Sequence, residues 1–112
     1  MLCRQSVTTL DFSKNQVGDD CADVISDYLS QSTAIVDLSL ASNQLMDQTA
    51  ILIGKALTVN QTLVRLNLID NSLSYPGLIA LLEGFTASVS MLELLLQRTV
   101  IMLITGRVII II

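Results

Sequence analysis

Apolar residues recur along this chain in a phrase that returns every 28 residues, the spacing from Asn15 to Asn43 and from Asn43 to Asn71. Counted from its first residue, the phrase has apolar residues at positions one, four, six and eleven, and asparagine at position nine. The copies begin at Val7, Ile35, Leu63 and Met91. In the fourth copy Thr99 replaces the asparagine. A fixed period of this length predicts a stack of similar structural units.

Each unit contains two different periodicities. Leu38 and Leu40 are two residues apart, so they share one face of a strand, and the same spacing predicts a short strand in every unit. Further along, Ala22, Ile25 and Leu29 are spaced three and four apart, which is typical of one face of a helix. A strand and a helix with one apolar face each cannot bury those faces alone. We therefore expect neighbouring units to stack around a continuous core.

Polar residues mark the turns between these elements. The ladder of Asn15, Asn43 and Asn71 follows the strands, where an amide that both donates and accepts can satisfy backbone groups of the turn. We interpret this ladder as structural. Asp19–Asp20 and Asp47 precede the helical segments and are expected to cap the amides of the helices that follow them.

These spacings resemble the leucine-rich repeat family over residues 4 to 101. The 28-residue period and the segments 11–15 and 40–43 resemble its ribonuclease-inhibitor-like subtype, as found in ribonuclease inhibitor and in the repeat regions of NOD-like receptors. The resemblance implies an α/β fold in which the chain forms a right-handed solenoid, a partial horseshoe. Parallel strands would line its concave side and helices its convex side.

The sequence predicts one leucine-rich repeat domain, residues 1–112, that is a fragment of a longer array. Its repeats are expected at about 4–31, 32–59, 60–87 and 88–112, the last one degraded. For the apolar tail 99–112 three interpretations stay open: a degraded repeat, an artefact or a membrane-associating segment. A membrane span is disfavoured because it needs roughly 20 apolar residues. Uncapped ends, Val108 to Ile112 in particular, favour self-association.

Composition excludes several classes of function. The chain has no histidine, the commonest general base and metal ligand, so we expect no catalytic residues, no metal site, no cofactor and no enzyme activity. The net charge is −4 and the six basic residues are scattered, which argues against nucleic-acid binding. The acidic residues between Asp19 and Asp27 lack the ligand spacing of a calcium loop. Cys3 and Cys21 form no disulfide framework, which favours a cytoplasmic setting.

The residues that alternate with the buried leucines are the remaining candidates for function. They vary from unit to unit while the leucines do not, as in repeat proteins that display a binding surface. The candidate contacts with a protein partner are Asp11, Asp37, Ser39, Arg65, Asn67 and Glu93. The sequence thus favours a protein-interaction module. The alternatives are a regulatory fragment resembling Ran GTPase-activating proteins, and a fragment of a larger repeat protein without a function of its own.

Overall fold

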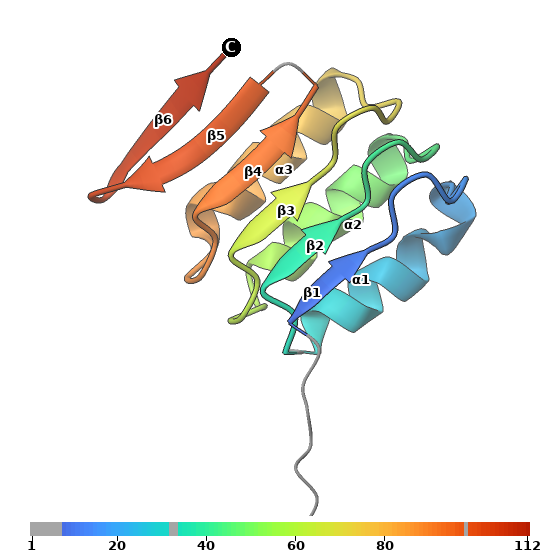
Figure 1. Cartoon of the computed structure of the whole chain (residues 1–112), viewed down its shortest axis with the longest axis horizontal. Coiled ribbons are helices and arrows are strands. Elements are labelled where there is room, and N and C mark those ends of the chain that lie inside the picture. Colours follow the sequence, from blue (N-terminus) through green and yellow to red (C-terminus); the bar gives the residue numbers. More distant parts are fainter. Residues whose placement is uncertain (1–7, 32–33, 98) are drawn as a thin grey trace, which may run out of the picture.

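In the computed structural model, helices lie against one face of a six-stranded sheet whose strands follow the chain order (Figure 1). The strands are β1 (Thr9–Asp11), β2 (Asp37–Ser39), β3 (Arg65–Asn67), β4 (Glu93–Leu96), β5 (Thr99–Ile104) and β6 (Arg107–Ile111). The helices are α1 (Ala22–Ser30), α2 (Asp47–Leu57) and α3 (Tyr75–Ala87), with a short 3-10 turn, η1 (Asp19–Cys21), before α1. The structure describes residues 8–31, 34–97 and 99–112. The predicted beginnings of the first two repeats, including Val7, and also Cys3 lie outside these ranges.

The 28-residue period of the sequence becomes the lateral register of the sheet. Strands β1 to β4 are parallel, and Leu10 pairs with Leu38, Leu38 with Leu66 and Leu66 with Leu94. The last three of these leucines are almost fully buried and face the helices, where Ile53 is also buried. This parallel, in-register arrangement fits the α/β repeat fold that the sequence predicts.

Helices α2 and α3 approach each other through two glycines. A Cβ atom added to Gly84 would lie 2.4 Å from the carbonyl oxygen of Gly54. One added to Gly54 would lie 2.4 Å from the carbonyl oxygen of Ala80. Both distances are too short for any side chain, so the two backbones touch directly. Hydrophobic periodicity does not reveal this contact.

The turns that leave the first three strands share one backbone feature. Lys14, Ser42 and Asp70 each precede a ladder asparagine and have positive φ values of 60°, 55° and 62°. This left-handed conformation is uncommon for residues other than glycine. Its recurrence in three consecutive units shows that the repeated phrase specifies the turn as well as the strand.

The C-terminal segment departs from the repeat that the sequence predicts for 88–112. Strand β4 pairs parallel with β3, but no helix follows α3 in the described residues, and β5 and β6 instead run back and forth as an antiparallel hairpin. Its two-residue turn, Thr105–Gly106, has positive φ at both residues, as in type I′ turns. The β-branched residues after it favour a strand over a helix. Ile101 is still buried, because it pairs with Leu94 on the core side of the sheet.

Across the described ranges, no helix has the length and apolar character that a membrane span requires. The longest helix, α3, has 13 residues. The tail that suggested a membrane-associating segment forms β5 and β6.

Asp19 and Asp47, which were expected to cap their own helices, cap the next unit instead. In none of the described helices α1, α2 and α3 does the N-cap side chain accept a hydrogen bond from a backbone N–H of that helix. The Asp19 carboxylate accepts the N–H of Met46, the N-cap of α2, at 2.7 Å, and the hydroxyl of Thr49 at 2.7 Å. The Asp47 carboxylate accepts the N–H of Ser74, the N-cap of α3, at 2.8 Å, and also its hydroxyl. Each carboxylate therefore ties one unit to the following one.

Asp47 should make folding stability depend on pH. The hydrogen bonds from the Ser74 hydroxyl and N–H hold the pKa of Asp47 below its ordinary value. A lowered pKa in the folded state adds stability above the unfolded pKa of about 3.9, and this stability is lost as the pH falls through the folded pKa. We expect Asp47→Asn to flatten the fall in Tm between about pH 5 and 2, measured by circular dichroism. Asp27→Asn, on the exposed side of α1, is the control and should leave the fall unchanged. An equally steep fall in Asp47→Asn would contradict the role of Asp47.

Candidate functional site

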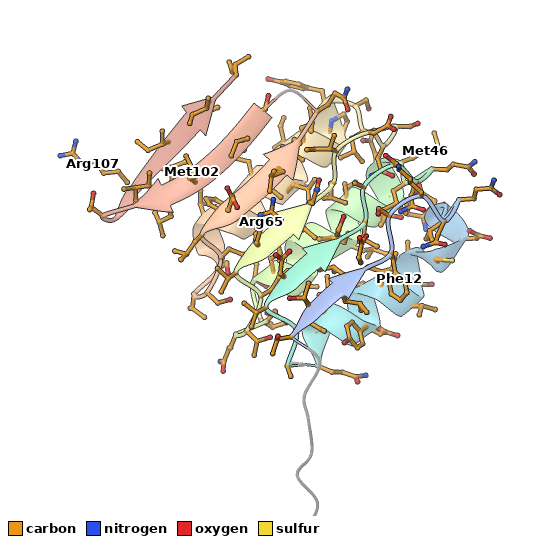
Figure 2. The ribbon with its side chains drawn as sticks, in the orientation of Figure 1. Phe12, Met46, Arg65, Met102 and Arg107 are labelled. Atoms are coloured by element: carbon orange, nitrogen blue, oxygen red, sulfur yellow. The ribbon has the colours of Figure 1, made fainter. Side chains whose placement is uncertain are left out.

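The sheet face opposite the helices is open to solvent (Figure 2). Two residues from each parallel strand point to this open face and form two rows across it. The first row is Thr9, Asp37, Arg65 and Glu93, and the second row is Asp11, Ser39, Asn67 and Leu95. All of the contact candidates chosen from the sequence fall in these rows. The structure thus brings them together on one surface.

A line of ion pairs crosses the first row. The Arg65 Nε atom lies 2.6 Å from the Glu93 carboxylate, and the Arg65 Nη1 atom lies 3.4 Å from the Asp37 carboxylate. The hydrogen bond to Glu93 is the main reason that the pKa of Arg65 is raised. The three side chains are 32% to 38% exposed, so each pair contributes only about 0.2–1 kcal/mol to stability. The main effect of the pairs is to hold three charged groups in fixed positions.

The second row is fixed by local turns at the strand ends. The Asp11 carboxylate accepts the N–H of Ser13 at 2.9 Å and its hydroxyl at 2.5 Å, and these bonds lower the pKa of Asp11. The Asn67 side-chain oxygen accepts the N–H of Ile69 at 3.0 Å. Asp11 is therefore ionised at neutral pH. Together the two rows carry the carboxylates of Asp11, Asp37 and Glu93 and one guanidinium, so this half of the face is acidic.

The open face continues into an apolar half that the sequence analysis missed. Leu95 pairs with Val100, and Met102, visible in Figure 2, pairs with Ile109, so these side chains lie on the same side of the sheet as Arg65. None of the three interpretations of the tail 99–112, a degraded repeat, an artefact or a membrane-associating segment, included a hairpin. Thr105–Gly106 between two β-branched runs is a hairpin signal that could have revealed this half.

The asparagine ladder connects neighbouring units through their backbones. The Asn43 side-chain oxygen accepts the N–H groups of Asn15 and Val17, both at 2.9 Å. Its amide nitrogen donates to the carbonyls of Phe12, Leu40 and Ala41. Asn71 repeats the pattern, accepting from Leu45 N–H at 3.1 Å. These bonds hold the turns at the end of the open face where each strand leaves the sheet.

The comparison with protein families bears directly on these features. The family model described as Leucine Rich repeat matches residues 5–26 and 59–82, which contain the repeated phrase and the beginning of the next helix in two units. These matches support a leucine-rich repeat protein. A search of the curated proteins returned no match. Leucine-rich repeats generally mediate protein–protein interaction, and their open strand surface serves as the binding surface.

One asparagine has a structural role that the leucine-rich repeat phrase does not include. Asn60 lies before the third strand, is 1% exposed, and donates from its amide nitrogen to the Leu29 carbonyl at 2.7 Å. Its oxygen accepts the N–H groups of Thr62 and Leu63. One unit later, the Ser88 hydroxyl accepts from Ser90 and Met91 in the same way. Residues 60–62 thus form a turn, and the side-chain amide nitrogen of Asn60 is buried in it.

The rest of the described chain offers little for chemistry. Among the residues that the structure describes, no three cysteine or acidic side chains come together as metal ligands. The carboxylates between Asp19 and Asp27 therefore do not form a cluster of that kind. Cys21 is a free thiol at a half-buried position. The arrangement is suited to recognition by its surface.

Apolar grooves lie at both ends of the repeat stack, on the helix side of the sheet. One has a volume of about 270 Å³ and lies beside β1, where Phe12, Ile25 and Tyr28 line it. The other has a volume of about 370 Å³, and its walls include Leu78 and Leu82 of α3 and Ile110 of β6. The second groove lies where a helix would cover β5 and β6 if the fourth unit had one.

Proposed function

We propose that this chain is a protein-interaction module that binds a protein partner through the open face of β1 to β4. The line Asp37–Arg65–Glu93 carries the proposal. It fixes charged groups on three neighbouring strands, which are spaced about 4.8 Å apart. A partner that meets side chains already held in place loses less conformational entropy on binding. Charges arranged in this way also favour one complementary partner over others.

The charge of the face favours a particular kind of protein surface. Three carboxylates and one guanidinium leave an acidic surface, so a partner with a basic patch opposite Asp11 and Asp37 is favoured. We further propose that the units belong to the ribonuclease-inhibitor-like subtype and form a right-handed solenoid shaped as a partial horseshoe. The open face would then be its concave side. The proposed setting is the cytoplasm.

Site-specific photocrosslinking in cells tests which face binds. A photoreactive residue at position 39 would lie on the open face, in β2 between β1 and β3. One at position 55 would lie on the exposed side of α2. We expect Ser39 to crosslink one defined protein and Lys55 to crosslink none. In the Ser39 version, Arg65→Glu should reduce that crosslink at least about tenfold, because it removes both ion pairs that hold Asp37 and Glu93 in fixed positions.

The folded state must be preserved for this result to count. Arg65 is part of a half-exposed ion pair, so Arg65→Glu should retain the wild-type circular dichroism spectrum. The control Lys55→Glu reverses a charge on the helix side and should leave the Ser39 crosslink unchanged. A crosslink that persists in Arg65→Glu, or that forms equally well from Lys55, would overturn the proposal.

A further inference from the structure

Strand β6 forms the free edge of the sheet, and both of its faces are apolar. Val108, Ile109, Ile110 and Ile111 are 42%, 38%, 51% and 50% exposed. Figure 1 shows β6 beside β5, with nothing on its other side. An exposed, apolar edge strand is a template for pairing with another strand.

The register of the hairpin shows which backbone groups face outward. The N–H of Leu103 donates to the Leu92 carbonyl at 2.8 Å, so Leu103 directs its backbone groups away from β6. Because backbone groups alternate in direction along a strand, the N–H and C=O groups of Met102 point toward β6. There Met102 pairs with Ile109. Consequently the backbone N–H and C=O groups of Ile109 point toward β5. Its neighbours Val108 and Ile110 direct their N–H and C=O groups to the free edge.

The usual features that protect an edge strand are missing from β6. Natural sheets block their edges with charged residues, proline, bulges or a covering element. From Val108 to Ile112 the chain has no charge and no proline, and the only charged residue of β6 is Arg107 at its beginning. The opposite edge of the sheet, β1, is shorter and ends at the ionised Asp11. The two edges therefore differ strongly in their capacity for pairing.

We propose that β6 pairs with β6 of a second copy of this chain, antiparallel, with Ile109 opposite Ile109 on a twofold axis. Ile109 is the middle residue of Arg107–Ile111, so this register pairs all five residues of the strand. Val108 of each copy then lies opposite Ile110 of the other, and these are the residues with outward backbone groups, so both can form ladder hydrogen bonds.

Charge favours this twofold register. Arg107 of one copy lies opposite Ile111 of the other, so the two guanidinium groups are at opposite ends of the pair. On the open face, the pair of Ile109 residues extends the apolar half that contains Met102. On the helix side, Val108 of the second copy lies beside Ile110, at the wall of the larger groove. Apolar surface is thus buried on both sides of the joined sheet.

The mass of the full chain in solution tests the proposal. Size-exclusion chromatography with light scattering should show a dimer whose fraction rises with concentration. Ile109→Lys and Ile109→Glu should each weaken dimerisation at least about tenfold, because like charges would face each other across the axis. An equimolar mixture of these two variants should recover the dimer, because the charges are then opposite. Thr9→Lys, on the β1 edge, is the control and should remain dimeric.

Three results would overturn the proposal. One is a wild-type chain that stays monomeric at all concentrations while circular dichroism shows it folded. Another is an open-ended series of oligomers, which would indicate head-to-tail pairing of β6 with β1. A third is a dimer that survives in Ile109→Lys or that is not recovered on mixing. The circular dichroism spectrum of each variant identifies any loss of the hairpin itself.

Discussion

Replacing Asn43 with alanine is expected to lower the free energy of unfolding by about 2–4 kcal/mol, as measured by urea denaturation. The side chain is only 9% exposed and bonds to backbone groups of two units. Alanine would leave the N–H groups of Asn15 and Val17 and the Leu40 carbonyl without this partner. Each buried polar group left unsatisfied costs about 1–3 kcal/mol, partly recovered where water can enter the turn.

Asn15 provides the matched control, because it occupies the same position in the first unit. Its side chain is exposed and its amide nitrogen donates to the Ser13 carbonyl in its own turn. We expect Asn15→Ala to change the free energy of unfolding by less than about 0.5 kcal/mol, as is usual for surface substitutions. Equal effects at the two positions would show that the bonds between units do not stabilise the stack.

Gly84→Ala is expected to lower the free energy of unfolding by about 1–3 kcal/mol, although alanine is the better helix former. In an isolated helix the change would stabilise by about 1 kcal/mol. Here the new Cβ would lie 2.4 Å from the Gly54 carbonyl oxygen and 2.8 Å from the Gly54 Cα. Backbone atoms cannot turn away as a side chain does, so α2 and α3 must separate and lose packing around Leu81.

A double-mutant cycle by urea denaturation separates this clash from other effects. Gly54→Ala creates a second clash in the same helix contact, so one separation of the helices relieves both. We expect Gly54→Ala with Gly84→Ala to cost less than the sum of the single changes. The control Thr86→Ala, at an exposed position of α3, should change stability by no more than about 0.5 kcal/mol. A stabilising Gly84→Ala would disprove the tight contact.

The sequence predicted the repeated part of the fold because there its pattern reports burial directly. The leucines that recur at positions four and six of the phrase alternate in a strand and face the core, as Leu66 and Leu68 do. The same spacing predicted which residues share the open face, because the side chains between two buried leucines must point away from them. For Arg65 and Glu93 the register also accounts for their ion pair.

The remaining features depend on information that one unit does not contain. The close contact between α2 and α3 is formed by Gly54 and Gly84. These glycines lie at different positions in their 28-residue units, so a comparison of the repeats does not identify them. Asp19 and Asp47 were placed correctly before helices but assigned to the wrong helix, because a capping pattern does not say which unit supplies the amide. In the tail, the continuous apolar run after Arg107 has neither helical nor alternating period, and a hairpin was missed there.

The carboxylates that join one unit to the next also determine where a further unit could be added to the stack. Asp19 holds the beginning of α2 and Asp47 holds the beginning of α3, and both bonds join residues 27 apart, in neighbouring units. A copy of residues 47–74 inserted after Ser74 would repeat the bond between Asp47 and Ser74, but it would place Ala56 where Gly84 now contacts Gly54. The equivalent position in the third unit is Tyr75, which has no carboxylate, and no helix follows α3 in the part of the chain that the structure describes. Lengthening the array by duplication within its middle would therefore also require glycine in place of Ala56 in the copy, and growth beyond α3 would require a new cap.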